Sequence, residues 1–375
     1  MFAAPCFVCM ILKRDSKETH KLHFCESDTM ADDSTNRDKR VTAAADRIEA
    51  IEPFQPHPLC HGGWLQTISV KWLNPQLSLD TRPDAIGISV PDDHTPPDEL
   101  SGYYFPATDK QADKPLVTVF HGMGGHALSR YMRSLGQRLN TNGYNVLLWN
   151  HRGAGQSASK CARFHHPGLT ADVCHLTEHL RAERPEWTRN GLACVAFSLG
   201  ANLLLKYLAE SGAESNFDAA VSVSAPLDME ITSKNLRTGS NQAFDQYLLN
   251  KQRDELLRSS AELTDEERST LNSVSSVWEL DDQFTAPRFG YEGAKDYYAE
   301  NSAVDSMQSI RTPTLLLHAK DDPVVVPEVF EGIEWEKNEA LYPLLCESGG
   351  HTGFFDQNRR RWHEASTIAF FDAVL

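Results

Sequence analysis

The sequence predicts an α/β fold built on a mostly parallel, doubly wound sheet, and two observations lead to this prediction. Short apolar runs bounded by Gly, Pro, Asp or Asn recur along the chain, as expected for strands that are buried on both faces. Amphipathic segments of helical length lie between several of these runs. Because strands that alternate with helices form parallel sheets with right-handed crossovers, residues 53–375 are expected to fold as one such domain.

The elements can be assigned in order along the chain. Strands are expected at residues 116–122, 145–150, 192–198, 219–225, 314–319 and 341–346, and one earlier strand is allowed. Helices are expected at residues 129–142, 171–184 and 201–211. Each strand-like run is short and rich in β-branched or other apolar residues, whereas each helical segment carries apolar residues on one face only.

One long insertion interrupts this alternation. Residues 229–305 are mostly polar and helical in pattern, with helices expected at 241–258 and 264–279. The segment is too long for a plain crossover between two strands. Loops at the carboxyl ends of parallel strands line the ligand crevice, so a helical cap over the active site is the favoured interpretation. A solvent-facing decoration is the alternative.

Composition and charge argue against several classes of partner. The chain has 375 residues, of which 41% are hydrophobic and 23% charged, as in ordinary soluble globular proteins. Its formal net charge of −16 argues against a nucleic acid or an anionic membrane as partner. The eight cysteines contain no tetrad with metal spacing, and the pair Cys6 and Cys9 lacks the context of a redox motif. No metal and a cytoplasmic location are therefore expected.

Residues 1–52 are expected to be a disordered N-terminal extension. The apolar run at residues 2–12 precedes its positive charge, has no small-residue cleavage site and is too short to span a bilayer, so no stable membrane insertion is expected. The following segment is rich in Lys, Asp, Glu, Ser and Thr. Met30 opens a more ordinary start, which suggests that translation begins there. Natural peptides from upstream of Met30, found by mass spectrometry, would contradict this hypothesis.

Ser198 is the candidate nucleophile because its surroundings predict a tight turn from a strand into a helix. An apolar strand runs to Phe197, and an apolar helix follows the serine. Such an elbow holds the hydroxyl out and needs small residues two positions before and after it. These positions are Ala196 and Gly200, so the usual first glycine is replaced by a residue with one additional methyl group. A base must remove the hydroxyl proton before the oxygen can attack.

His351 is the candidate base, since it lies on a glycine-rich loop after the last predicted strand. It would take the Ser198 proton and later return it to the leaving group. The acid that orients His351 is one of two adjacent aspartates, Asp321 and Asp322. Typical hydrolase loops place the acid four residues after the position of His318, which favours Asp322. Asp321 is the alternative.

The chain order Ser198, Asp322, His351 is that of the α/β-hydrolase triad, whereas other serine-hydrolase folds use other orders. It therefore predicts an α/β-hydrolase fold. Another pair of histidines, His175 and His179, has helical i, i+4 spacing and could bind a metal. A third ligand is missing nearby, so a solvated helix face is the favoured interpretation.

Two backbone N–H groups are expected to bind the oxyanion. Leu199 follows the nucleophile and supplies one, and Met123 in the glycine loop at 121–125 supplies the other. His121 in this loop is expected to be structural. The glycines could also suggest a phosphate cradle, but no P-loop motif is present, and residues 153–155 lack the third glycine and the acid of a dinucleotide site. No cofactor is therefore expected.

A set of motifs runs from residue 53 to the C-terminus: PFQP at 53–56, GGWLQT at 62–67, HGMGG at 121–125, NHRG at 150–153, FSLGANLLLKYL at 197–208, HAKDDP at 318–323 and GGHTGF at 349–354. Several of these motifs have no general hydrolase meaning. In these motifs the sequence resembles the YheT-like branch of the α/β-hydrolases, which includes ABHD-type lipid hydrolases and medium-chain ester synthase/esterases. The resemblance implies Ser198, Asp322 and His351 as the triad. The chain departs from it at Ala196 and Ala201, where the family usually has glycine.

The sequence thus predicts a serine hydrolase that cleaves carboxylic esters through an acyl-enzyme on Ser198. The resemblance implies a short- to medium-chain acyl group, so a small acyl ester is the expected partner. The same acyl-enzyme could pass to an alcohol, which would make the protein an acyltransferase. A peptidase or amidase could use the same residues, and a binding protein could keep the fold without catalysis. The natural substrate and the oligomeric state stay open at this level.

Overall fold

The computed structural model of the chain describes residues 51–70, 83–90, 96–107 and 113–375. The predicted disordered extension, apart from residues 51–52, and the hypothetical start at Met30 lie outside these ranges. No helix among the described residues is long and apolar enough to cross a membrane.

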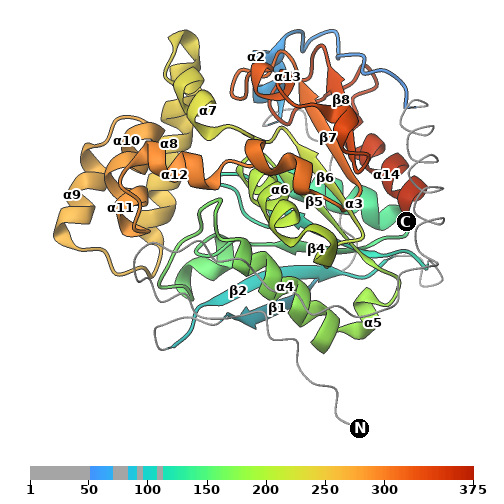
Figure 1. Cartoon of the computed structure of the whole chain (residues 1–375), viewed down its shortest axis with the longest axis horizontal. Helices are drawn as coiled ribbons and strands as arrows, with labels where there is room; N and C mark the ends of the chain where they lie inside the picture. Colours follow the sequence, from blue (N-terminus) through green and yellow to red (C-terminus); the bar gives the residue numbers. More distant parts are fainter. Residues whose placement is uncertain (1–50, 71–82, 91–95, 108–112) are drawn as a thin grey trace. The chain divides into compact units, whose positions relative to one another are not determined.

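The described residues form one eight-stranded sheet with the order β1-β2-β4-β3-β5-β6-β7-β8 (Figure 1). The strands are β1 (Asp84–Ser89), β2 (Glu99–Phe105), β3 (Leu116–Phe120), β4 (Asn145–Trp149), β5 (Leu192–Phe197), β6 (Ala219–Val223), β7 (Thr314–Ala319) and β8 (Leu341–Cys346). β2 pairs antiparallel with β1 and β4, and all other pairs are parallel. The six predicted strands are all present, and two strands precede them where the sequence allowed for one.

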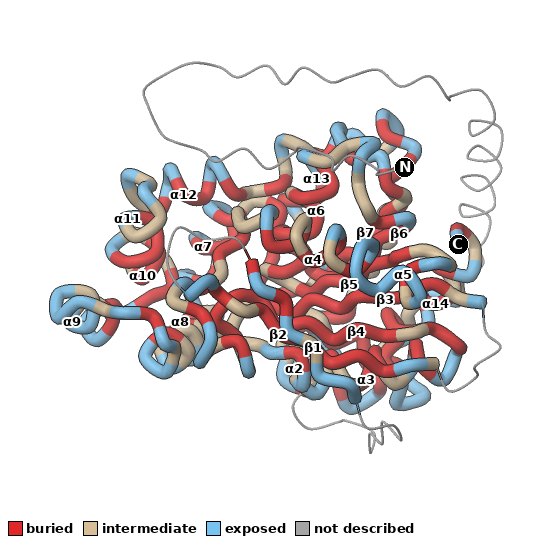
Figure 2. The backbone as a smooth tube through the Cα atoms, turned by 90° about the horizontal axis from the view of Figure 1, so that it is seen from below, coloured by how far each residue is buried: buried red, intermediate tan, exposed pale blue. Residues whose placement is uncertain are grey.

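Helices cover both faces of this sheet. One face carries α4 (Thr170–Glu183) and α6 (Leu199–Ser211), and the other carries α3 (Arg130–Thr141) and α14 (Trp362–Val374). All residues of β5 are buried. Two consecutive residues of this strand, Cys194 and Val195, belong to two different apolar cores. Figure 2 shows the central strands as a continuous buried layer. The α/β-hydrolase prediction of a doubly wound, mostly parallel sheet is therefore confirmed.

The segment between β6 and β7 is helical and has an apolar core of its own. It contains α7 (Met229–Leu236), α8 (Gln242–Arg258), α9 (Asp265–Ser273), α10 (Val277–Leu280), a π-helical turn (Asp281–Thr285), α11 (Ala286–Arg288) and α12 (Ala294–Asn301). In Figure 1 these helices, coloured yellow to orange, lie together beside the sheet. Thr264 and Glu267 form a capping box that begins α9. Leu249, Leu256 and Leu271 are buried in the separate core.

The remaining helices of the described residues are short. They are α2 (Gly63–Ser69), α5 (Pro185–Thr188) and α13 (Glu328–Glu331), with 3₁₀ turns at Gly155–Ser159, Gly212–Glu214, Gly239–Asn241, Val304–Ser309 and Trp335–Lys337. Of these, α2 matters most for the site, because it lies against the loop that follows β8. A Cβ atom added to Gly350 in that loop would lie 2.4 Å from the carbonyl oxygen of Gly63. Only glycine therefore allows this close approach.

Candidate active site

Ser198 lies on a strained turn between β5 and α6. Its φ of 51° is positive, which is rare for a residue with a side chain, and its N–H donates to the carbonyl oxygen of Val223 at 2.9 Å. Helix α6 begins close to the end of the neighbouring strand β3. A Cβ at Gly200 would lie 2.2 Å from the carbonyl oxygen of His121, which follows β3. The predicted tight turn is thus present, with its second small position filled by the residue that the packing requires.

Ala196, the residue that departs from the usual elbow pattern, fits within the sheet. It is fully buried in β5 and pairs with Phe120 of β3 and Ser222 of β6. Its side chain belongs to the core beneath α6. The additional methyl group therefore fills core space, and the turn at Ser198 forms in its presence.

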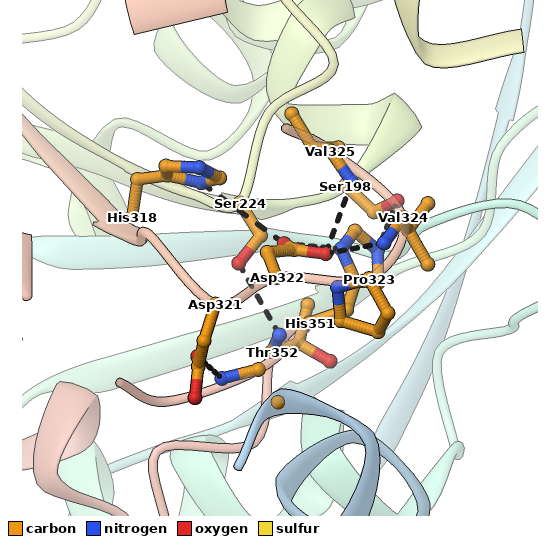
Figure 3. A network of polar contacts seen from close by, with 12 residues as sticks. Ser198, Ser224, His318, Asp321, Asp322, Pro323, Val324, Val325, His351 and Thr352 are labelled. Carbon is orange, nitrogen blue, oxygen red and sulfur yellow. Dashed lines mark hydrogen bonds and ion pairs between the residues drawn. The ribbon is translucent and has the colours of Figure 1, made fainter. Parts of the chain in front are cut away.

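The three residues that the sequence singled out meet at the carboxyl ends of the strands (Figure 3). His351 Nε2 lies 2.8 Å from Ser198 Oγ, and His351 Nδ1 lies 2.8 Å from Asp322 Oδ2. The other carboxylate oxygen of Asp322 accepts the N–H groups of Val324 and Val325 at 2.8 and 3.0 Å. The Asp322 side chain is fully buried, and both of its oxygens are hydrogen-bonded. This arrangement fixes the carboxylate before any substrate arrives.

Asp321 faces the same loop but contacts its backbone. Its Oδ1 accepts the N–H of Gly350 at 2.9 Å, one residue before the histidine (Figure 3). Burial raises the pKa of its carboxyl group, and the bond from Gly350 opposes this rise. Of the two aspartates, Asp322 therefore contacts the imidazole of His351, and Asp321 contacts the backbone of Gly350, the residue before this histidine.

Two hydroxyl groups hold the histidine loop, and neither role was predicted from the sequence. Thr67 Oγ1, from α2, accepts the N–H of His351 at 2.8 Å. Ser224 Oγ, directly after β6, accepts the N–H of Thr352 at 3.2 Å. Thr67 ends the GGWLQT motif at residues 62–67, which lies far along the chain from the candidate triad and was the available signal. Ser224 has a positive φ of 54°, a strained conformation next to the site.

A second histidine lies behind the acid. His318 Nδ1 is 4.0 Å from Asp322 Oδ2, and its ring stacks on Phe330 with centroids 4.0 Å apart. Burial lowers the pKa of His318 to about 4, so the ring is neutral near neutral pH. The carboxylate of Asp322 therefore has one close imidazole partner, His351.

The loop after β3 lies directly beside the serine. A Cβ at Gly122 would lie 2.9 Å from Ser198 Cβ. Met123 and Leu199 line the same cavity as Ser198. Within the described part of the chain, neither Met123 N–H nor Leu199 N–H has an acceptor. Two residues that line the cavity with Ser198 thus carry backbone N–H groups without a partner in the described residues.

The cavity at Ser198 has a volume of about 60 Å³. Its walls are largely apolar and include Met123, Leu199, Leu236, Leu248 and Val277. Its polar lining includes Asp281 and Tyr298, joined by a hydrogen bond of 2.8 Å from the phenol to the carboxyl. Burial raises the pKa of Asp281 to about 7. Much of this lining comes from residues 229–305, so the helical insertion forms one wall of the cavity.

The described residues contain no group of three or more His, Cys, Asp and Glu side chains that could hold a metal ion. His175 lies 4.0 Å from Glu178, one turn along α4, and the sequence had paired it with His179.

Comparison with known proteins gives a consistent set of relatives. The family model described as "Serine aminopeptidase, S33" (Hydrolase_4) matches residues 111–334. The putative esterase YheT of Escherichia coli (strain K12) is 35% identical over 248 residues, which are 64% of this chain and 71% of that protein. A monoacylglycerol lipase of Saccharomyces cerevisiae is 31% identical over 72% of this chain and 62% of its own length.

Two further comparisons agree with these. Medium-chain fatty acid ethyl ester synthase/esterase 2 of the same yeast is 28% identical over 70% of this chain and 63% of that protein. The chain therefore matches less than two thirds of either yeast relative. Among solved structures, the Pyrococcus furiosus esterase Pf2001 superposes with a TM-score of 0.53 and 17% identity, covering 86% of this chain and 98% of that one. At this identity the likeness concerns the fold alone.

Proposed function

Because the chain belongs to the YheT-like branch of the α/β-hydrolases, within the family described as serine aminopeptidase, S33, we propose that it hydrolyses carboxylic esters through an acyl-enzyme on Ser198. The observation that carries the proposal is the hydrogen-bonded line from Ser198 through His351 to Asp322, with 2.8 Å at each step. The names of the relatives, which are esterases and lipases, favour an ester over an amide substrate.

In acylation, His351 acts first as a base and then as an acid. His351 Nε2 takes the proton of Ser198 Oγ as this oxygen attacks the ester carbonyl carbon. The oxygen of the tetrahedral intermediate accepts the N–H groups of Met123 and Leu199. Asp322 stabilises the imidazolium of His351 across the 2.8 Å contact. The intermediate then collapses, and the alcohol leaves with the proton from Nε2.

Deacylation repeats these steps with water as the nucleophile. His351 removes a proton from the water molecule, the new tetrahedral intermediate uses the same two N–H groups, and Ser198 leaves with the proton. An alcohol in place of water would give a new ester, so acyl transfer is a second outcome of the same intermediate. The balance depends on which acceptor reaches Ser198 beneath residues 229–305.

We further propose that this insertion acts as a cap that limits the acyl chain. The cavity of about 60 Å³ is small, so a short acyl group fits it best as it stands. Longer acyl chains require the helices of residues 229–305 to move. A preference for short chains over medium ones follows from this geometry.

The test is a series of p-nitrophenyl esters of increasing acyl length, with wild type, Ser198→Ala and Ser211→Ala. Ser211 ends the same helix, far from the nucleophile, and serves as the matched serine control. We expect Ser198→Ala to lose at least about 10³-fold in kcat and to lose labelling by a fluorophosphonate probe, with Ser211→Ala unchanged. Equal turnover by wild type and Ser198→Ala would refute the nucleophile. Absence of both turnover and labelling in wild type would favour a binding protein.

A further inference from the structure

Stabilisation of an oxyanion requires donors that are held in place before the reaction. If the proposed function is right, Met123 N–H is such a donor, and it belongs to the loop His121–Gly125, called here the oxyanion loop. Glycines make this loop flexible on its own, so its aim depends on what surrounds it. The contacts around it are therefore informative.

Tyr131 holds the oxyanion loop from one side. It lies in the first turn of α3, and its phenol oxygen accepts the N–H of Gly122 at 3.0 Å. Its ring packs edge-on against Phe197, the residue before the nucleophile, with centroids 4.9 Å apart. A Cβ at Gly125 would lie 2.7 Å from the same phenol oxygen. The hydroxyl thus binds Gly122 and leaves no room for a side chain at Gly125.

Two buried histidines, His151 and His121 of the loop itself, add further contacts. His151 Nε2 lies 2.9 Å from the carbonyl oxygen of His121, and the backbone N–H of His151 donates to His121 Nε2 at 3.2 Å. His121 Nε2 is therefore an acceptor, which leaves the proton on Nδ1, 2.9 Å from the carbonyl oxygen of Gly122. The carbonyl oxygens of His121 and Gly122 are thereby both engaged. Burial lowers the pKa of both histidines, which keeps these neutral forms in place.

The backbone N–H of Met123 differs from those of Gly122 and Gly125. Gly122 N–H is bound by Tyr131, and Gly125 N–H donates to the carbonyl oxygen of Gly122 at 3.0 Å. Met123 N–H has no acceptor among the residues that the structure describes, and Met123 lines the cavity with Ser198. Hydrogen bonds therefore hold the backbone at Gly122, whereas the N–H of Met123 is left for a ligand.

We propose that Tyr131 is a positioning residue that aims Met123 N–H at the oxyanion by holding Gly122 N–H. Without the phenol oxygen, the N–H of Gly122 loses its acceptor in a buried place, and the loop turns to find another. The protein then stabilises the transition state less, because the oxyanion is fully charged there. Binding of the ester itself weakens less, because its carbonyl oxygen carries little charge.

The test compares Tyr131→Phe with Tyr144→Phe on p-nitrophenyl esters. Tyr144 is a matched control, since its buried ring also carries a hydrogen-bonded hydroxyl, which donates to Asp372 at 2.6 Å away from the site. We expect Tyr131→Phe to lower kcat about 10- to 100-fold with KM within twofold of wild type, and to slow fluorophosphonate labelling similarly. Tyr144→Phe is expected to keep kcat within twofold, although both variants melt at lower temperature.

A second variant covers the case in which Tyr131→Phe does not fold. Gly125→Ala keeps the tyrosine but places a methyl group 2.7 Å from its phenol oxygen and 3.0 Å from the carbonyl oxygen of Gly122, which disturbs the contact between Tyr131 and Gly122. A fall in kcat at constant KM in this variant supports the proposal. Wild-type kcat in a folded Tyr131→Phe or Gly125→Ala protein, or an equal fall in Tyr144→Phe, overturns it while the ester hydrolase stands. A wild-type protein without turnover overturns the proposed function instead, and the positioning role with it.

Discussion

At the scale of single residues, the two adjacent aspartates divide one task between them. Asp322 contacts the imidazole of His351, and Asp321 binds the peptide N–H of Gly350. The first contact sets the orientation and charge of the ring, and the second holds the loop that carries it. A sequence comparison of acidic residues alone would treat the two as competitors, whereas the geometry gives each a separate partner.

This division predicts unequal effects of two matched substitutions. We expect Asp322→Asn to lower kcat by about 10³- to 10⁴-fold, because an amide cannot stabilise the imidazolium and favours the wrong tautomer. Asp321→Asn keeps an oxygen that accepts the Gly350 N–H, so a loss within about tenfold is expected. Steady-state kinetics with one p-nitrophenyl ester measures both. A larger loss in Asp321→Asn than in Asp322→Asn would reverse the assignment.

The residues proposed to take part in the reaction were easier to find in the sequence than the residues that hold them in position. Ser198 and His351 have local signals, a strand-turn-helix pattern and flanking glycines. Thr67 and Ser224 act on His351 and Thr352, from which they are separated by 284 and 128 positions along the chain. A hydroxyl that bonds a distant backbone N–H leaves no periodic pattern, so the sequence cannot identify such pairs.

At the scale of elements, predictability followed burial. The central strands β3, β5, β6 and β7 are buried throughout and mostly apolar because both faces are covered, and each was predicted. β1 is mostly exposed, with Ile88 as its one buried residue, and contains Gly87, so its pattern is weak. In β2, Gly102 lies where a Cβ would be 2.5 Å from the Trp149 ring. This glycine reads locally as a strand breaker, yet a bulky neighbour in β4 explains it. The antiparallel edge was therefore under-counted.

The cap helix α8 offers a matched pair of leucines for testing the proposed limit on acyl length. Leu248 lines the cavity at Ser198, whereas its neighbour Leu249 is buried in the core of the insertion. Leu248→Ala is expected to move the preferred acyl chain to a length greater by about one to three carbons, with each fitted methylene contributing about 1–3 kcal/mol. The measurement is kcat/KM across the p-nitrophenyl ester series.

Leu249→Ala is the control for stability, since removal of a buried leucine side chain costs about 2–5 kcal/mol wherever it lies. It is expected to lower the melting temperature without a change in the preferred chain length. The same shift in preference in both variants would indicate loosening of the whole insertion. An unchanged preference in Leu248→Ala would mean that the acyl chain does not occupy this cavity.

At the scale of the whole molecule, buried histidines set the response to acid. Burial strongly lowers the pKa of six of them: His121, His151, His165, His166, His318 and His363. Between pH 6.5 and about 4 the unfolded chain binds protons at these side chains and the native protein does not. Stability contributed by their burial is therefore present above pH 6.5 and lost as the pH falls towards 4.

Buried carboxyl groups act in the opposite direction. Burial raises the pKa of Asp281 and Glu255 to about 7, so between about pH 4 and 7 the native protein holds protons that the unfolded chain releases. Three further carboxyl groups have a raised pKa without so large a shift: Asp245, Asp321 and Glu364. Because the strongly shifted histidines outnumber the strongly shifted carboxyls, we expect net loss of stability below pH 6.5. Composition alone gives the number of histidines, but the fold decides which of them leave water.

His363 isolates one such contribution. It is fully buried at the start of α14, between the rings of Phe197 and Phe354, and neither ring nitrogen has a partner among the described residues. His363→Phe removes the proton that only the unfolded chain binds. We therefore expect the free energy of unfolding to fall less steeply between pH 6 and 5, by about 1.4 kcal/mol per pH unit relative to wild type. Urea unfolding across this pH range measures it. The exposed His61→Phe variant should keep the wild-type slope because its ring stays in water, and an unchanged slope in His363→Phe would show that His363 is protonated in the native protein.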